Sequence, residues 1–338
     1  MEKLIQVNFF CHAGSGIGLG HLTRCISIWN ELNNVNNLII KFHIICDKPI
    51  PISNKKLIPK YIDINTEFND NLTLDLKYEK QIFILDFNQN YINDNLINFF
   101  LSIKSTKIII AVDSLLKYHE YIDYFFMPTF QFHKNFLNIC NKKISWGWDH
   151  LLLNPKYDPV EKCFMNKKIL ILTGGSDSTN LGQTFPEKLD KNIEVNSEIN
   201  WVVGPFSKQP TLPNNQINNW KIHQSPKNLD DIFLNCNYSI TIFGVSFFEL
   251  LYYGIPTVVF SPYDDKDEKE LVQIEKLAVA LVAKNEDDAM FKLNVLMKDS
   301  KTSSLLSMNS KKLFKQSGSK TFLNILKNII LNKWQKVI

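Results

Sequence analysis

The 338-residue chain lacks the features that mark nucleic-acid-binding proteins and zinc proteins. Its 38 basic and 34 acidic residues almost balance, and no Lys/Arg block with interleaved aromatic residues occurs, which argues against a nucleic-acid surface. Cysteine is scarce at six residues, and none of the six forms a CxxC spacing, so a zinc site has little support. We therefore expect no metal ion, no cofactor and no nucleic-acid partner.

Long apolar runs are also missing. No run approaches the roughly 18 residues of a membrane-spanning helix, and the first residues, MEKLIQVNFF, lack the pattern of a cleavable signal. The basic, amphipathic segment 320–338 is predicted to be a helix, and we favour its packing across the outside of a domain over peripheral contact with a membrane. These features predict a reduced, soluble, cytoplasmic protein and leave its oligomeric state open.

Short apolar runs recur along the chain and alternate with helical patterns. Leu22, Ile26 and Trp29, for example, share one face of a helix predicted over 21–32. The apolar runs are continuous rather than alternating in polarity, which is typical of strands covered on both faces. They lie at 4–10, 37–47, 81–87 and 107–114 and, after a break, at 169–175, 199–205, 238–243 and 255–260.

The two blocks of strand–helix alternation indicate two α/β domains. The chain is long for one domain, and hydrophobic residues, at 45%, suffice for two cores. We predict two Rossmann-like, doubly wound domains that face a cleft, at 1–160 and 165–318, followed by a C-terminal helix at 319–338.

Glycine is sparse, yet four of the twelve glycines fall within seven residues, at every second position from 14 to 20. This spacing is not the GxGxxG fingerprint of dinucleotide-binding proteins, and GSKT at 318–321 lacks the upstream glycine and the strand of a P-loop. In parallel α/β sheets the first strand-to-helix turn is a common ligand site, where glycine lets backbone N–H groups approach the ligand. Gly18 and Gly20 are therefore candidate substrate-binding residues.

His21 follows these glycines at the amino end of the predicted helix. This position disfavours a positive imidazolium, so we expect a neutral ring that can accept a proton. The alternative is a histidine that caps the turn or bonds a buried carbonyl; behind a glycine-dense turn we favour a catalytic base. Arg24, about one helical turn further on, is expected to meet a carboxylate or a phosphate oxygen.

The segment GIGLGHLTRC (16–25) resembles the GxGHxxR segment of the UDP-sugar hydrolases of the pseudaminic-acid pathway, which act on a UDP-2,4-diacetamido-2,4,6-trideoxy-altropyranose, and of related spore-coat polysaccharide proteins. The resemblance continues in order along nearly the whole chain. The further matching stretches are ILDF (84–87), AVDS (111–114), WGWDHLLLNPKY (146–157), LTGGSDSTNL (172–181) and SITIFGVSFFELLYYGIPTVVF (239–260).

The resemblance implies a GT-B-like pair of Rossmann domains, with UDP held mainly by the second domain. It makes His21 the catalytic residue. It places Gly18, Gly20, Arg24, Asp86 and Asp113 on the substrate side, and Gly174, Gly175, Ser176, Gly244, Ser246 and Glu249 on the nucleotide side.

These residue types suit the implied roles. Glycines that end a strand before a helix expose backbone donors for a diphosphate, and Glu249, three residues beyond Ser246, can hold the ribose hydroxyls. The alternative for Glu249 is a first-turn carboxylate that only favours the helix dipole. Asp86 and Asp113 follow apolar runs, where each could orient His21 or a sugar hydroxyl, or simply be a common residue after a strand.

Several positions depart from the family pattern. Asn88 and His150 stand where the family has tyrosine, and Asn154 stands where it has arginine. The Gly-Ser-Thr of the nucleotide segment is Gly244–Ser246 with valine in the middle, and SPYDDKDE at 261–268 replaces an Asn-Gln pair. The sequence thus matches the family pattern more closely at the nucleotide-binding positions than at the sugar-binding positions.

The expected function is the hydrolysis of a UDP-linked amino or deoxy sugar with inversion at the anomeric carbon, in the biosynthesis of a surface glycan that contains a nonulosonic acid. One alternative is an inverting glycosyltransferase with the same UDP-sugar donor. Cell-wall N-acetylglucosaminyltransferases also resemble this sequence in layout. Another is a non-catalytic nucleotide-sugar binder, against which the presence of His21 and Arg24 counts, because a pure binder needs no base.

Overall fold

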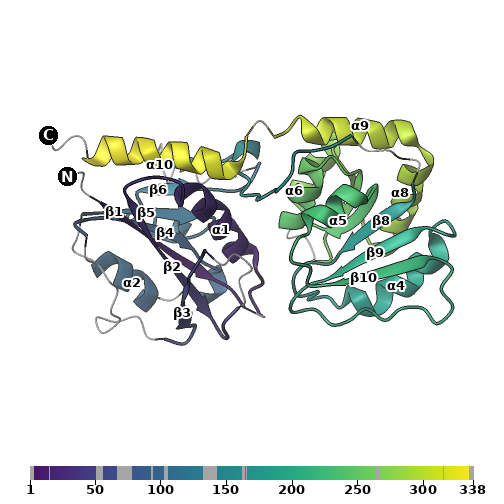
Figure 1. Ribbon diagram of the computed structural model, residues 1–338, viewed down its shortest axis with the longest axis horizontal. Coiled ribbons are helices and arrows are strands. Elements are labelled where there is room, and N and C mark those ends of the chain that lie inside the picture. The colour runs from purple at the N-terminus through teal and green to yellow at the C-terminus, as the bar shows by residue number, and fades with distance from the viewer. Residues whose placement is uncertain are drawn as a thin grey trace. The chain divides into compact units, whose positions relative to one another are not determined.

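The chain divides by its internal packing into two compact units, which we describe separately from a computed structural model. The first unit comprises Met1–Asn154 and Gln316–Ile338, and the second comprises Pro155–Lys315 (Figure 1). The structure describes residues 4–14, 16–50, 56–66, 78–92, 94–102, 106–131, 143–161, 164, 166–263, 267–314 and 316–334. Parts of two predicted segments, 264–266 and 335–338, lie outside the described residues, as do Cys140 and Cys163.

The first unit is built on a parallel sheet with the strand order β3-β2-β1-β4-β5-β6-β7. The strands are β1 (Ile5–His12), β2 (Leu38–Cys46), β3 (Lys60–Asp63), β4 (Lys80–Asp86), β5 (Thr106–Val112), β6 (Tyr124–Phe126) and β7 (Ile144–Ser145). The helices are α1 (Gly20–Leu32), α2 (Asp94–Ser102) and α10 (Gly318–Trp334), with short 3₁₀ turns at η1 (Gln89–Tyr91), η2 (Leu116–Tyr118) and η4 (Trp148–His150). The predicted strands and the first predicted helix of this block are confirmed.

The two faces of this sheet are covered by different helices. Phe83 and Phe125 pack with Phe100 of α2 on one face. On the other face, Phe126 contacts Phe322 of α10, and α10 lies beside α1 (Figure 1). Burial on both faces explains why the strands are continuously apolar.

The second unit repeats the same architecture with the strand order β10-β9-β8-β11-β12-β13, all parallel. The strands are β8 (Lys168–Leu172), β9 (Glu198–Val203), β10 (Asn219–Gln224), β11 (Tyr238–Ile242), β12 (Thr257–Phe260) and β13 (Leu281–Val282). The helices are α4 (Leu181–Asn192), α5 (Asp230–Asn235), α6 (Val245–Tyr252), α7 (Glu268–Leu277), α8 (Glu286–Lys298) and α9 (Ser300–Lys311). The prediction of two doubly wound α/β domains is therefore confirmed.

The last helix, α10, belongs to the first unit although it follows the second in sequence. Its buried face includes Phe322, Leu326 and Trp334. From the sequence we expect 319–338 to be a segment by itself that packs across the outside of a domain; in the structure this domain is the first one. Within the described residues, no helix is long and apolar enough to cross a membrane.

The buried stripe of α1 differs in part from the predicted one. Leu22 and Trp29 are buried as expected, but Ile26 is only partly buried, and Cys25 and Ile28 face the core instead. The difference arises because α1 lies against both the sheet and α10, so its buried face is wider than the stripe inferred from three apolar residues.

Candidate functional site

The glycine turn of the first unit brings the start of α1 to the carboxyl ends of β1 and β4. Gly14 and Gly18 form a small bridge, with the Gly18 N–H donating to the Gly14 carbonyl at 2.7 Å. Gly18 has φ of +84°, a conformation that glycine adopts readily. A Cβ on Gly18 or Gly20 would meet no described atom within 4 Å, so there is open space beside both residues. This is the space expected next to a substrate.

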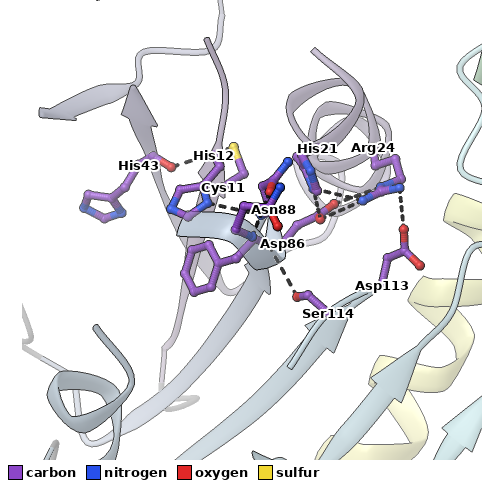
Figure 2. A network of polar contacts seen from close by, with 11 residues as sticks. Cys11, His12, His21, Arg24, His43, Asp86, Asn88, Asp113 and Ser114 are labelled. Atoms are coloured by element: carbon purple, nitrogen blue, oxygen red, sulfur yellow. Dashed lines mark hydrogen bonds and ion pairs between the residues drawn. The ribbon is translucent and has the colours of Figure 1, made fainter. Parts of the chain in front are cut away.

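His21 and Asp86 form a close pair at this edge of the sheet (Figure 2). His21 Nδ1 lies 2.6 Å from Asp86 Oδ1, and the Asp86 side chain is fully buried. Arg24 Nη2, which can only donate, also lies 3.0 Å from Nδ1. One nitrogen cannot serve both neighbours in the same tautomer, and because a carboxylate can only accept, we assign the proton of the shorter, 2.6 Å contact to Nδ1. In this tautomer Nε2 is unprotonated, and it makes no hydrogen bond with a described residue. The arrangement is that of an oriented general base.

Arg24 joins both aspartates of the predicted substrate side (Figure 2). It donates to Asp86 from Nε at 3.0 Å and from Nη2 at 2.8 Å, and from Nη1 to Asp113 Oδ2 at 2.8 Å. The guanidinium therefore meets carboxylates, one of the two expected partners, and binds Asp86 in a bidentate way. Asp113, with φ of +53° and a side chain 38% exposed, reaches Arg24 rather than His21.

Charge in this cluster is compensated. Burial alone would raise the pKa of Asp86, but Arg24 and the hydrogen bond from His21 outweigh it and hold that pKa below its ordinary value. Burial likewise opposes the charge on Arg24, but Asp86 and Asp113 outweigh it and raise the pKa of Arg24. Asp86 thus stays ionised beside His21, where it can stabilise a developing imidazolium.

His12 is a second histidine of this cluster and is not among the residues predicted from the sequence. β1 continues to His12, two residues beyond the predicted run, and buries the ring against Phe87. Its Nδ1 accepts a hydrogen bond from the Asn88 N–H at 3.1 Å. Burial, with the nearby His21, lowers the pKa of His12 to about 4. The only sequence signal for this residue was its place at a strand end, two residues before the glycine turn.

In the second unit, the turn after β8 shows how the TGGSD stretch folds. Gly174 has φ of +86°, and Gly204 packs so closely on the carbonyls of Gly174 and Gly175 that it has no room for a Cβ. Asp177 accepts hydrogen bonds from the N–H groups of Leu181 and Gly182, at 3.0 and 2.8 Å. Asp177 therefore bonds the start of α4 and already uses two of the backbone donors there.

The turn after β11 leaves its helix start uncapped. Gly244 is the N-cap of α6, and within the described part of the chain no side chain caps the first N–H groups of this helix. Because β8 and β11 are neighbours in the sheet, Gly174–Ser176 and Gly244–Ser246 lie at the same edge. α6 is thus the better of the two helix starts for a diphosphate.

Glu249 stands one turn into α6. Burial, with the charge of Asp230, raises the pKa of Glu249 to about 8. The carboxyl group is therefore largely protonated at pH 7 and can both donate and accept a hydrogen bond. A carboxyl group that both donates and accepts suits a sugar hydroxyl. The alternative role, in which a charged carboxylate favours the helix dipole, needs the ionised form.

The remaining departures from the family pattern fall in different places. Asn154 bonds Asn30 of α1, with the Asn30 Nδ2 donating to its Oδ1 at 3.1 Å. The Asn88 side chain accepts a hydrogen bond from the N–H of Asn90 and caps η1.

Among the described residues, no group of three His, Cys, Asp or Glu side chains is placed to hold a metal ion.

The structure therefore has two Rossmann-like domains of the GT-B type, each with ligand-accessible turns at the carboxyl ends of its strands. No protein-family model matches the chain. An uncharacterised protein of Methanocaldococcus jannaschii is 30% identical over 139 residues, which cover 37% of this chain and 28% of that protein, so the match spans about a quarter of the relative's length.

Similar solved structures include UDP-GlcNAc 2-epimerases and a glycosyltransferase. The S. aureus MnaA structure with UDP has a TM-score of 0.63 at 13% identity and covers 96% of both chains. The UDP-GlcNAc 2-epimerase of Neisseria meningitidis, bound to UDP-GlcNAc, has a TM-score of 0.61 at 10% identity and covers 96% of this chain and 100% of its own. The calicheamicin glycosyltransferase CalG4 has a TM-score of 0.62 at 9% identity and covers 98% and 99%. At these identities the likeness establishes the fold.

Proposed function

We propose that the protein is an enzyme that releases UDP from a UDP-linked amino or deoxy sugar by inverting attack of water on the anomeric carbon. The observation that carries the proposal is the His21–Asp86 pair, whose 2.6 Å contact turns the free Nε2 of the imidazole away from the carboxylate. The motifs shared with the pseudaminic-acid hydrolases support water as the nucleophile and a nonulosonic-acid surface glycan as the destination. The solved structures bound to UDP and to UDP-GlcNAc support the nucleotide.

In the proposed reaction, His21 Nε2 takes a proton from water as the oxygen attacks the anomeric carbon. The bond from that carbon to the UDP oxygen breaks, and UDP leaves with the electron pair. Asp86 stabilises the imidazolium that forms. Within the second unit, we assign the binding of UDP to the turns after β8 and β11. Arg24 acts as a positioning residue, because its two bonds to Asp86 hold the carboxylate beneath the histidine.

An inverting glycosyltransferase is the second candidate, and the likeness of the fold to CalG4 favours it. The same base would then take its proton from a sugar hydroxyl or a lipid-linked hydroxyl instead of water. The two reactions differ only in the molecule that supplies the attacking oxygen, so the effect of an added acceptor on UDP release distinguishes them.

The release of UDP in water tests the proposal. We expect the purified protein to release UDP from a UDP-linked acetamido sugar without any acceptor, and to do so equally well in EDTA. A coupled assay for UDP, run with and without added acceptor sugars, measures this. UDP release that requires an acceptor would establish the transferase, and no UDP release under either condition would indicate a nucleotide-sugar binder. Loss of UDP release in EDTA and its restoration by a divalent ion would contradict metal-free chemistry.

Binding of UDP alone tests the assignment of the nucleotide to the second unit. We expect His21→Ala to leave the affinity for UDP unchanged, because the histidine acts on the sugar side. Glu249→Leu is expected to weaken UDP binding about tenfold, which corresponds to the loss of one or two hydrogen bonds to ribose, whereas Glu249→Gln keeps a donor and an acceptor and most of the affinity. Calorimetry measures all three variants. A collapse of UDP binding in His21→Ala would place the nucleotide on the first unit instead.

A further inference from the structure

Helix α8 of the second unit carries an exposed phenylalanine on its outer face. Its inner face packs on β11 and β12, and α9 lies beside it (Figure 1). The buried residues of this inner face are Ala289, Met290, Leu293 and Leu296. On the opposite face, Phe291 is 67% exposed, more than any other aromatic residue that the structure describes. One exposed apolar residue is ordinary on a protein surface, but the residues around this one form an ordered pattern.

Four exposed residues of α8 form one stripe along the helix. They are Asp287, Phe291, Val295 and Lys298, spaced by four, four and three residues. At 3.6 residues per turn this spacing places them within about 80° of one another. The Asp287 side chain is 74% exposed, and Val295 is 37% exposed. The stripe is therefore acidic at its start, apolar in its middle and basic at its end.

The order of the charges alone has an ordinary explanation. The dipole of any helix favours an acidic residue near its start, such as Asp287, and a basic residue near its end, such as Lys298. The dipole does not account for the exposed apolar side chains of Phe291 and Val295 between them. These side chains gain from burial only where another surface covers them. A surface that covers the stripe has to match its charges as well.

A second copy of α8, running in the opposite direction, matches the stripe along its whole length. About a two-fold axis near residue 293, Phe291 faces the partner's Val295 and Asp287 faces the partner's Lys298. The centres of these two pairs differ by half a residue, which is less than ~1 Å along the helix. A two-fold axis makes each contact occur twice. A parallel pair would instead place the two copies of Asp287 against each other.

We propose that α8 is an interaction surface for a second copy of this chain, through antiparallel two-fold pairing of the stripe from Asp287 to Lys298. The pairing does not depend on the proposed function, because it uses none of the residues assigned to the substrate or to UDP. A single pair of helices buries less than the roughly 1,200 Å² of a standard stable interface, so the dimer is weak and reversible. We expect a dissociation constant on the order of 10–100 µM.

Sedimentation equilibrium of the full chain tests the pairing, over protein concentrations of about 1–300 µM. Phe291→Ser removes two phenyl rings from the dimer and is expected to raise the dissociation constant at least about tenfold. Serine and phenylalanine have similar helix propensities, so α8 is kept. Tyr121→Ser is the control, because Tyr121 is 52% exposed but belongs to the first unit. A chain that stays monomeric throughout, or a dimer that Phe291→Ser leaves unchanged, would overturn the proposal.

A charge swap tests the antiparallel direction. Asp287→Lys and Lys298→Asp each bring like charges together twice, so each is expected to raise the dissociation constant about threefold to tenfold. In an equal mixture of the two variants, mixed dimers again join opposite charges at both contacts. We therefore expect the mixture to dimerise as tightly as the unsubstituted protein, and the double variant Asp287→Lys/Lys298→Asp to do the same.

The mixture is compared with each single variant under the same conditions. This comparison does not depend on the small loss of helix stability that Asp287→Lys causes at the start of α8, because that variant is present in both samples. No recovery in the mixture would overturn the antiparallel pairing even where Phe291→Ser abolishes the dimer, since a parallel or unrelated contact does not join positions 287 and 298.

Discussion

Replacement of His21 by asparagine is expected to lower turnover by about 10²–10⁴-fold, the usual contribution of a general base. The asparagine amide can still donate to Asp86, so the local structure is kept while the proton acceptor at Nε2 is lost. Because the histidine acts in the transition state, the change is expected in kcat, with only a modest change in KM. Steady-state measurement of UDP release gives both constants.

The pH profile provides a control for this variant. Any fall of turnover at acid pH that depends on the imidazole is expected to vanish in His21→Asn. His12 does not complicate the result above about pH 5, because its pKa is held at about 4 by burial. Retention of most of the turnover in His21→Asn would rule out His21 as the base, and Asp86 and Asp113 would be tested next.

The second large effect concerns stability. Arg24→Met is expected to destabilise the first unit by about 3–5 kcal/mol, the usual result of leaving a buried charge without its partner. The Asp86 side chain is fully buried and receives two hydrogen bonds from the guanidinium. Urea unfolding followed by a probe in the first unit measures the change in the free energy of unfolding.

Asp113 provides the matched control, since it bonds the same guanidinium from a partly exposed position. Asp113→Asn is expected to change the free energy of unfolding by at most about 1 kcal/mol. The double variant Arg24→Met/Asp86→Asn should recover part of the loss, because it removes the unpaired charge. Equal effects of Arg24→Met and Asp113→Asn would mean that the burial of Asp86 does not decide the stability of the cluster.

The same carboxylate makes stability depend on pH in a definite direction. The pKa of Asp86 is lower in the folded protein than its ordinary value, so the ionised form is favoured by folding. Its contribution to stability is complete above the ordinary carboxyl pKa and is lost as the pH falls through the lowered value. In Arg24→Met this dependence should shrink or reverse, because burial then acts on the carboxyl group without the opposing guanidinium.

The local sequence was sufficient for the architecture and for the position of the glycine turn before His21. Continuous apolar runs such as QIFILDF predicted buried parallel strands, and their separation into two blocks predicted two doubly wound domains. The glycines before His21 predicted a ligand-accessible turn, and the structure shows open space beside Gly18 and Gly20. These features depend on periodicity and on backbone freedom, which neighbouring residues carry by themselves.

Which residues meet one another was decided only by the tertiary structure. Asp86 and Asp113 were equivalent in sequence, since both follow apolar runs, yet only Asp86 contacts His21, while the backbone turns at Asp113 towards Arg24. The burial of His12 likewise depends on strand length and on packing between residues far apart in sequence.

The placement of α10 is the clearest case of this kind. By sequence the helix follows the second unit, yet it belongs to the first, because Phe126 and the turn at His150 provide the surface that its apolar face covers. The amphipathic pattern determined that 318–334 forms a helix with one face to bury. It could not determine where, because the hydrophobic effect rewards burial against any complementary surface, and only the folded sheet presents that surface.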